Sequence, residues 1–365
     1  MDGLKELNTS LFVVDLSEFY HLLNASDYIN NYTFELDHRT LTCEATTVSP
    51  VVNIVVCMFY VLVFLLAIPG NLVVGLVLIS DKRPLLSFDL YLLHLAVADT
   101  LLALTLPFWA VAAVRSWVFG NAVCKLVSLA QEATFYSSIL FLACISIDRY
   151  FVIVHAVEAR RERRQTRSWV ACAAVWALGG ALSLPALFNN SFRPHGSEWA
   201  VCTEYYDPDS ADRWRLATRL LRHGLGFLLP LTVMLACYGT TVARLIRTQG
   251  FQKQRAMRMI AAVLAAFLVC WTPYHLALMV DTLLRAGLLA YGCEARTSVY
   301  MAMFSTQGFG LLHCCVNPFL YAFVGEKFQR NLRRLLQKKG VLERPPPPQT
   351  SRPASQSSDV TSTVL

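Results

Sequence analysis

Residues 51–79 read VVNIVVCMFYVLVFLLAIPGNLVVGLVLI, a stretch without a single charged side chain. A helix needs roughly 20 mostly apolar residues to cross the hydrocarbon core of a membrane, so this stretch is long enough to span one. Six more apolar stretches follow along the chain. The sequence therefore predicts an all-α integral membrane protein, a bundle of seven transmembrane helices. The predicted spans are 51–79, 88–114, 123–154, 168–188, 214–245, 257–284 and 299–324.

The overall composition agrees with a membrane bundle. Hydrophobic residues make up 55% of the 365 residues and charged residues only 16%, whereas soluble domains carry about 25% charged residues. This composition excludes a disordered chain, a coiled coil and a nucleic-acid-binding domain with a basic face. Residues 1–43 hold only short apolar runs, so we expect no secretory signal peptide and a first span that directs insertion.

The distribution of basic residues predicts the orientation of the bundle. Most of the 32 lysines and arginines fall in the segments 82–83, 160–167 and 244–258 and in the tail after residue 324. Basic loops stay on the cytoplasmic side, which places the N-terminus outside the cell and the C-terminus inside. We therefore expect a multi-pass protein of the cell membrane. Four glycosylation sequons fall in segments assigned to the outside, and they begin at Asn8, Asn24, Asn31 and Asn189.

Four regions of different composition follow one another along the chain. Residues 1–50 are expected to form an acidic, glycosylated extracellular arm, and residues 51–324 the bundle. Residues 325–337 are basic and amphipathic, which predicts a short helix lying on the anionic lipid of the inner membrane surface. Residues 338–365 are rich in Pro, Ser and Thr and are expected to be a disordered cytoplasmic tail.

Four of the 11 cysteines lie at or beyond the predicted outer membrane face. In an oxidising compartment, four cysteines predict two disulfide bonds with three alternative pairings, and the residues alone do not choose among them. The other cysteines lie within the spans, where this side chain packs as a small hydrophobe. The four outer cysteines are Cys43, Cys124, Cys202 and Cys293.

Asp99 lies in the middle of the second predicted span. An ionisable side chain is costly there and is a functional candidate by default. Ser138 and Asn317 are polar at a similar depth in other spans, as are Asn71 and His313. A carboxylate surrounded by hydroxyl and amide oxygens suits a small cation, so an allosteric Na⁺ bound by Asp99, Ser138 and Asn317 is one interpretation. The alternative is a protonated Asp99 that hydrogen-bonds within the bundle.

Three groups of residues combine charges, aromatic rings and helix kinks in the cytoplasmic half of the bundle. They end the third span, kink the sixth span and kink the seventh span. Each group alone is compatible with simple packing or with a weak surface ion pair, but three in different spans favour a conformational switch. The candidate switch residues are Asp148, Arg149, Tyr150, Tyr238, Phe267, Trp271, Pro273, Asn317, Pro318 and Tyr321.

These motifs, in this order on seven spans, resemble the rhodopsin-like G-protein-coupled receptors over about residues 40–340. Other stretches are similar to chemokine receptors, and in particular to the CXC receptors for interleukin-eight-type ligands. The stretches that carry the resemblance are Gly70-Asn71, Leu95–Asp99, Thr105–Trp109, Trp117–Gly120, Asp148–Ala156, Cys270–Pro273, His313–Pro318 and Ser362–Leu365.

The resemblance implies a receptor without enzymatic activity or a required cofactor. It would bind a CXC chemokine outside and a heterotrimeric G protein of the inhibitory class inside, and so drive leukocyte chemotaxis. It also implies disulfide bonds between Cys124 and Cys202 and between Cys43 and Cys293. A non-signalling chemokine scavenger and a peptide receptor of the same fold stay open as alternatives. A transporter is disfavoured because Asp99 is nearly alone and no internal repeat is visible.

The extracellular arm and the mouth of the bundle are the predicted ligand-binding regions. Residues 1–43 carry an excess of acidic side chains, which would steer a basic protein ligand; a merely solubilising tail is the alternative. Three arginines spaced i, i+4 and i+7 share one helix face and could receive an acidic group of the ligand, or simply snorkel. The candidates are Asp15, Glu18, Tyr20, Asp27, Tyr28, Trp109, Arg215, Arg219, Arg222, Asp281, Arg285 and Gln307.

Two neutral residues depart from the pattern of the receptors that this chain resembles. Gln131 and Gln307 occupy positions where such receptors often carry a charged side chain, so we expect a pocket without a buried charge pair. Asp281 and Arg285 are spaced i, i+4 and could pair with each other.

The C-terminal tail predicts two further partners. Phosphorylated hydroxyls would add negative charge and recruit arrestin, and Thr363-Val364-Leu365 fits a PDZ-domain protein that binds a free carboxylate. An ordinary disordered tail is the alternative, and no nucleic-acid partner is expected. The candidate phosphorylation sites are Ser355, Ser357, Ser358, Thr361, Ser362 and Thr363.

Overall fold

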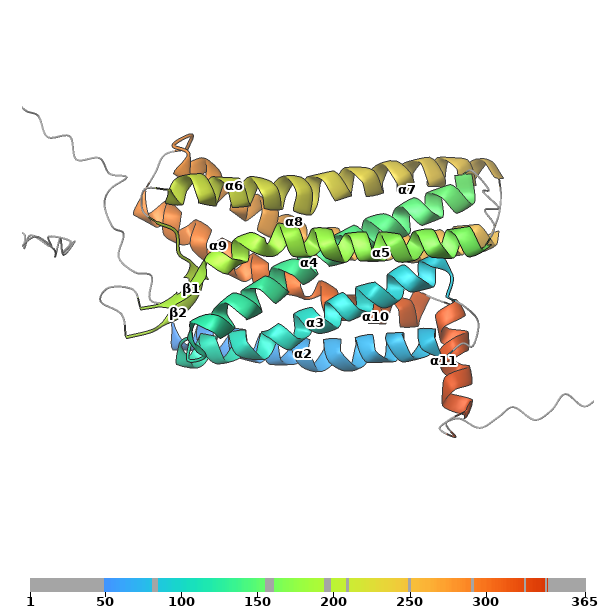
Figure 1. Cartoon of the computed structure of the whole chain (residues 1–365), viewed down its shortest axis with the longest axis horizontal. Coiled ribbons are helices and arrows are strands. Elements are labelled where there is room, and N and C mark those ends of the chain that lie inside the picture. The colour runs from blue at the N-terminus through green and yellow to red at the C-terminus, as the bar shows by residue number, and fades with distance from the viewer. Residues whose placement is uncertain are drawn as a thin grey trace, which may run out of the picture.

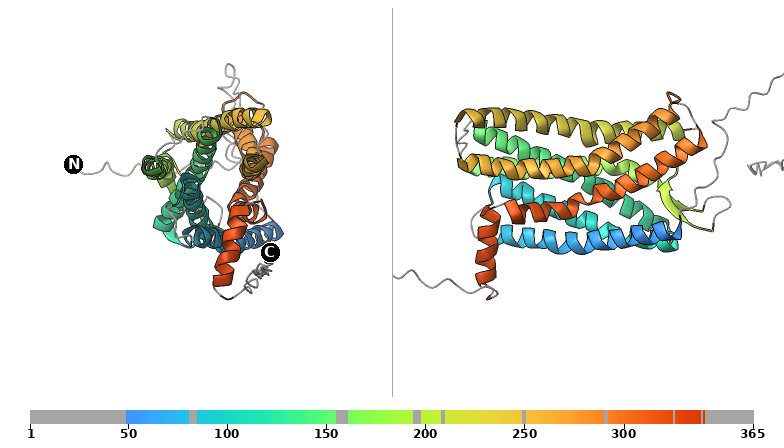
Figure 2. Two further views of the ribbon diagram at one scale, coloured as in Figure 1. Left: turned by 90° about the vertical axis from the view of Figure 1, so that its right-hand side faces the viewer. Right: turned by 180° about the vertical axis from the view of Figure 1, so that it is seen from behind.

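Seven helices long and apolar enough to cross a membrane lie side by side in the described part of the chain (Figures 1 and 2). The seven predicted spans are therefore confirmed, with helix ends that differ from the predicted ends by a few residues. The computed structural model describes residues 49–80, 85–154, 161–193, 198–207, 210–248, 251–289, 292–324, 326–338 and 340.

The first four spans are single helices, whereas the fifth and seventh are interrupted. The first four are α2 (Pro50–Ile79), α3 (Ser87–Arg115), α4 (Gly120–Val154) and α5 (Arg161–Ser183), which ends in the 3₁₀ turn η1 (Leu184–Phe188). The fifth comprises α6 (Ala211–His223), the π-helical turn η2 (Gly224–Leu228) and α7 (Leu229–Thr248). The last two are α8 (Phe251–Arg285) and the pair α9 (Cys293–Leu311) and α10 (His313–Val324).

Prolines inside these helices are tolerated because the surroundings are a bundle. Pro69, Pro107, Pro273 and Pro318 all lie within helices, where each removes one backbone hydrogen bond. Neighbouring helices and side chains can satisfy the freed groups inside a membrane protein. Asn71 illustrates such cross-linking, because its Nδ2 donates to the backbone oxygen of Cys314 at 2.8 Å and so ties α2 to α10.

The core of the bundle surrounds α4, which packs against α3, α5 and α7. Its largest fully buried side chains include Phe141, Ile139 and Phe267. On α2, by contrast, Val51, Ile54 and most other large apolar residues of the outer half are exposed. An apolar surface of this kind suits contact with lipid, in which apolar side chains need no cover from other protein elements.

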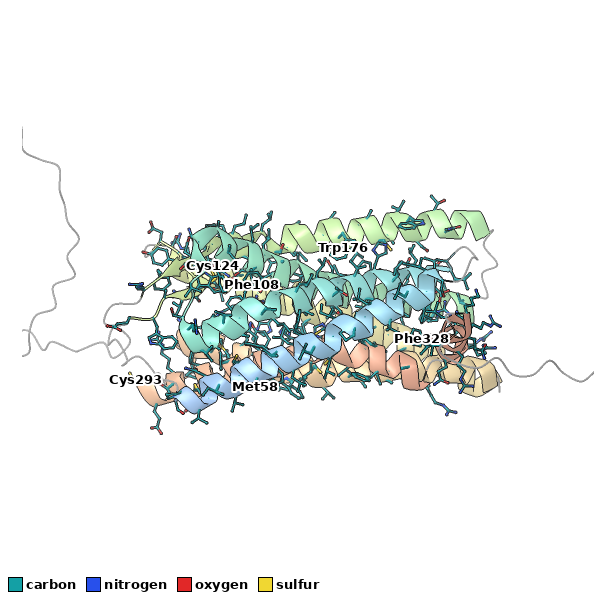
Figure 3. The ribbon with its side chains drawn as sticks, turned by 90° about the horizontal axis from the view of Figure 1, so that it is seen from below. Met58, Phe108, Cys124, Trp176, Cys293 and Phe328 are labelled. Carbon is teal, nitrogen blue, oxygen red and sulfur yellow. A yellow bond between two sulfur atoms is a disulfide. The ribbon has the colours of Figure 1, made fainter. Side chains whose placement is uncertain are left out.

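A short hairpin covers the extracellular end of the bundle (Figure 1). β1 (Asn189–Phe192) pairs antiparallel with β2 (Val201–Glu204). The Cys124–Cys202 disulfide, one of the two bonds that the resemblance implies, fixes this hairpin to the start of α4, and Figure 3 shows Cys124 at that end. Cys293, at the start of α9, is also disulfide-bonded, and its expected partner Cys43 lies outside the described residues.

The predicted helix after the last span is present at the opposite end of the bundle. α11 (Glu326–Lys338) leaves α10 and runs across the bundle axis (Figure 1). Phe328, labelled in Figure 3, is buried, and Leu332 and Leu335 pack against the core. The three arginines of this helix are exposed, namely Arg330, Arg333 and Arg334. One apolar and one basic face fit the predicted position on the inner membrane surface.

Candidate ligand pocket and signalling core

Several predicted site residues fall outside the described part of the chain. Of the four candidate glycosylation sites, Asn189 lies in the described part of the chain, where it is partly buried at the start of β1. For Tyr321 only the backbone is described. The residues outside the description are Asp15, Glu18, Tyr20, Asp27, Tyr28, Cys43, Asn8, Asn24, Asn31, Ser355, Ser357, Ser358, Thr361, Ser362 and Thr363.

Asp281 is shared between two guanidinium groups at the mouth of the bundle. Its Oδ2 lies 2.5 Å from Nη2 of Arg219 on α6 and 2.9 Å from Nε of Arg285, one turn further along α8. The Asp281 side chain is only 7% exposed, so this contact is well shielded from water. The i, i+4 pair of Asp281 and Arg285 is thus present, but it also includes Arg219 and ties α6 to α8.

A second ion pair lies deeper. Nη2 of Arg222 contacts Oε1 of Glu132 on α4, and Nη1 of Arg222 donates to the hydroxyl of Tyr274 at 2.5 Å. The pocket therefore contains a partly buried charge pair, although not at the positions of Gln131 and Gln307. Gln131 and Gln307 are neutral, but Glu132, the next residue on α4, supplies the carboxylate. Glu132 could have been found from the sequence by the criterion that singled out Asp99, which is an ionisable residue within an apolar span.

Glu132 and Arg222 border a small cleft, and the ring of Trp271 contributes to it from α8. The remaining lining residues are Leu102, Gln131, Phe135, Tyr274, Gln307 and Leu311. Five helices, α3, α4, α6, α8 and α9, thus converge on one cleft, and the space between the helices of a bundle is a usual place for a ligand site.

Trp109, a predicted ligand-binding residue, lies apart from the described cleft lining. Its ring packs against Trp117 with centroids 5.3 Å apart, and Trp117 in turn contacts Phe119. Together with Phe108, these rings surround the Cys124 end of α4. The described contacts of Trp109 are thus packing contacts with the aromatic rings around the Cys124–Cys202 disulfide.

Glu204, at the end of β2, was not singled out from the sequence. Burial raises the pKa of its carboxyl above the ordinary value, while the guanidinium groups of Arg219, Arg215 and Arg285 act in the opposite direction. The hairpin thus brings a third acid to the arginines of the mouth. Basic and acidic side chains nearly balance in this region, so the mouth is not the simple cationic surface that the α6 arginines predicted.

The polar residues predicted to meet in the middle of the bundle do so around Asp99. Asp99 is completely buried. Ser138 Oγ donates to its Oδ1 at 3.2 Å, and Asn317 Nδ2 donates to its Oδ2 at 2.8 Å. His313 Nε2 lies 3.6 Å from Oδ1. Two carboxylate oxygens and a hydroxyl are suitable ligands for a small hard cation, whereas Asn317 presents its nitrogen to the carboxylate and so acts as a positioning residue.

Trp271 connects the cleft to this polar centre. Its ring packs on Phe135 with centroids 4.6 Å apart, and its Nε1 donates to Nδ1 of His313 at 3.1 Å. Gly310 makes room for it, because a Cβ at this position would lie 2.9 Å from the indole Cε3. Phe267, one turn below on α8, is buried. A change at the cleft floor would thus reach His313, and through it the surroundings of Asp99.

At the inner end of the bundle, Arg149 is held by its neighbour. Its Nε and Nη2 contact Oδ2 of Asp148 at 3.1 and 2.5 Å, and its guanidinium lies 4.7 Å from the centroid of the Phe88 ring. Tyr238 packs against the bundle core. Since residues 243–260 contain no acid, this segment of the chain offers Arg149 no carboxylate.

Comparison with known proteins agrees with this architecture. Residues 70–321 match the family described as 7 transmembrane receptor (rhodopsin family). C-X-C chemokine receptor type 1 of Homo sapiens is 45% identical over 291 residues, which cover 80% of this chain and 82% of that receptor. C-X-C chemokine receptor type 2 of Homo sapiens is 42% identical over 312 residues, or 85% of this chain and 86% of that receptor. The type 1 receptor of Oryctolagus cuniculus is 44% identical over 291 residues, or 80% and 81%.

Proposed function

Because this chain belongs to the rhodopsin family of seven-transmembrane receptors and, within it, to the C-X-C chemokine receptors, we propose that it binds a CXC chemokine of the interleukin-eight type. Binding outside the cell would activate a heterotrimeric G protein of the inhibitory class inside and so direct leukocyte migration. The observation that carries this proposal is the cleft lined by the Arg222–Glu132 ion pair and by Trp271.

The paired arginines define how an acidic group of the ligand would bind. Arg219 and Arg285 share Asp281, and Arg222 contacts Glu132. Leaving one partner of a shielded ion pair unpaired is costly. An incoming carboxylate would therefore replace Asp281 or Glu132 on a guanidinium, rather than bind to a free arginine. The acidic arm, by contrast, would attract the basic body of a chemokine by long-range steering.

Replacement at Arg222 offers a direct route to the switch. Arg222 donates to Tyr274, and the Tyr274 ring packs edge-on against Trp271 with centroids 5.8 Å apart. Movement of Arg222 would therefore release Tyr274 and alter the packing of Trp271 one turn below. α8 can bend at Pro273, where one backbone hydrogen bond is missing. The ligand would thus shift an existing equilibrium between two helix packings.

At the inner end, the shift would free Arg149 from Asp148 and expose a surface for the G protein. Asp148 and Arg149 are only partly buried, so their pair is weak enough to exchange. We also propose that a Na⁺ ion bound by Asp99 and Ser138 favours the resting packing, because a cation there would hold α3 to α4. Arrestin at the phosphorylated tail, a PDZ-domain protein at the C-terminus and lipid under α11 complete the proposed partners.

The proposed function is tested in cells that express the chain and are challenged with a panel of chemokines. We expect CXC chemokines to lower cyclic AMP, and Arg222→Gln to reduce their potency. Arg149→Ala should keep chemokine binding but lose the cyclic-AMP response. Chemokine uptake without any change in cyclic AMP would instead identify a scavenger, and a response to non-protein ligands alone would exclude a chemokine receptor.

The tail is tested separately by truncation after Glu343. The truncated receptor should signal through the G protein normally and internalise more slowly than the full-length receptor, because it lacks the proposed phosphorylation and PDZ sites. Unchanged internalisation kinetics would contradict a role of the tail in recruiting arrestin.

A further inference from the structure

Two histidines that the proposed signalling route does not use are hydrogen-bonded to each other between the fifth and sixth spans. His223 is the last residue of α6, and His275 lies on α8. Their Nδ1 atoms are 3.2 Å apart. A hydrogen bond between these two atoms holds a single proton, so one ring donates and the other accepts. The pair is thus a polar contact that joins two different helices.

The histidine contact lies directly beside the contact of Arg222 with Tyr274. Arg222 precedes His223 on α6, and Tyr274 precedes His275 on α8. Nη1 of Arg222 donates to the hydroxyl of Tyr274 at 2.5 Å. Two consecutive residues of one helix therefore contact two consecutive residues of the other. A rotation of α6 that broke the histidine bond would also move Arg222 away from Tyr274, because both contacts depend on the same short stretch of backbone.

The orientation of α6 needs contacts of this kind, because α6 does not continue regularly into α7. The π-helical turn η2 (Gly224–Leu228) begins directly after His223 and separates the two helices. A π turn interrupts the regular hydrogen bonds of an α-helix and is a place where helices bend, so α7 alone fixes the direction of α6 less firmly. Arg219 holds α6 to α8 through Asp281. His223 holds it at the joint itself.

Packing alone does not account for the two histidines. His275 is buried and stacks on Phe227, with ring centroids 4.1 Å apart, and an apolar ring would fill this place equally well. Among the residues that the structure describes, the buried Nε2 atoms of both histidines have no hydrogen-bond partner. An unsatisfied buried polar atom lowers stability, so the pair adds little net stability to the bundle. A polar contact between packed helices can instead fix their register.

We propose that His223 and His275 are positioning residues for Arg222. Their hydrogen bond fixes the rotation of α6 and so keeps the Arg222 guanidinium against Glu132 and Tyr274. An arginine held in this way is ready to exchange one carboxylate for another without searching for its position. The role of Arg222 toward the ligand rests on the proposed function, whereas its placement by the histidines does not, so the placement is tested without a chemokine.

The experiment is a double-mutant cycle on the melting temperature of the purified full-length receptor without ligand. His275→Phe keeps an aromatic ring against Phe227 and removes the hydrogen bond. In this background the fall in melting temperature caused by Glu132→Gln should shrink to about half or less of its wild-type size, because coupled contacts are not additive. His275→Asn keeps a hydrogen-bonding group near the position of Nδ1 and should preserve the full fall. A purely structural role would change the melting temperature of the histidine variants and leave the effect of Glu132→Gln the same.

His94→Phe is the matched control, because His94 is hydrogen-bonded to Trp176 elsewhere in the bundle, and Glu132→Gln should have its full effect there. The proposal is overturned by an effect of Glu132→Gln that is the same in the wild type and in His275→Phe, or that His275→Asn reduces as much as His275→Phe does. Should His275→Phe fail to fold, His223→Leu removes the bond from the α6 side and is judged by the same comparison. A receptor that shows this coupling but does not respond to chemokines would contradict the proposed function and leave the positioning role intact.

Discussion

Glu132→Gln should destabilise the resting receptor while making it more sensitive to its ligand. The change removes the charge that Arg222 contacts but keeps the size and polarity of the side chain. Losing one partner of a fully buried ion pair costs about 3–5 kcal/mol. Both side chains are 22% exposed here, and Arg222 keeps its bond to Tyr274, so we expect a loss of about 2 kcal/mol.

A loss of this size is measurable as thermal stability of the purified receptor without ligand. Because the entropy of unfolding grows with chain length, about 2 kcal/mol in a chain of 365 residues corresponds to a fall of roughly 3 °C in melting temperature. Arg222→Gln should cause a similar fall. The double variant should fall by little more than either single variant, because the two side chains act as one pair. A double variant that falls by the sum of the two would show that the pair contributes nothing.

Chemokine potency should move in the opposite direction. In Glu132→Gln, a carboxylate of the ligand no longer competes with an internal carboxylate for Arg222. Each 1.4 kcal/mol is a factor of about ten in affinity, so the concentration for half-maximal cyclic-AMP response should fall by up to about tenfold. Arg222→Gln should raise it instead. Equal losses of potency in both variants would refute the replacement of Glu132 by the ligand and would leave only a structural role for the pair.

Other positions give independent tests. Burial raises the pKa of Glu204 in the folded state, so the wild type loses stability as pH rises from the ordinary pKa of about 4.3 through this raised pKa. Glu204→Gln has no carboxyl to titrate, so its melting temperature relative to that of the wild type should rise over the same pH range. A constant difference between the two would contradict this. Gly310→Ala should lower the melting temperature, since overpacking against the indole costs about 1–3 kcal/mol, while Gly180→Ala, with open space at its Cβ, should not. Residues 243–260 contain no acid, and we predict that adding one by Lys253→Glu lowers ligand-free G-protein turnover, since an ion pair with Arg149 would be worth roughly 0–1 kcal/mol. An unchanged agonist maximum is the control, and unchanged ligand-free turnover would refute the prediction.

The spans could be predicted from the sequence because the constraint on them is local. A helix that crosses lipid must be apolar over its own length, and residues 51–79 reveal this without reference to the rest of the chain. The interruptions were harder to predict. The π-helical turn Gly224–Leu228 precedes Pro230, which hinted at irregularity, but the break at Leu312 in the seventh span has no proline beside it. Such breaks depend on how neighbouring helices pack.

The candidate site was predicted in part, for a similar reason. The depth of Asp99 in its span follows from counting residues, so its meeting with Ser138 and Asn317 could be foreseen. The partners of the α6 arginines could not, because spacing along one helix detects only i, i+4 pairs such as Asp281 and Arg285. The contact of Arg219 with Asp281 joins two helices, and its existence depends on their relative rotation.

This difference changes the interpretation of ligand recognition. Arginines on one face of an isolated helix suggest a cationic surface that any acidic ligand could use. In the folded bundle, Arg219, Arg222 and Arg285 are already matched to internal carboxylates, so a ligand gains only the difference between its own carboxylate and the one that it replaces. A group placed slightly wrongly would leave an acid unpaired in a shielded site and lose affinity. The internal acids Asp281 and Glu132 therefore act as competitors that raise specificity, and exchange at Arg222 connects that selection directly to Tyr274 and Trp271.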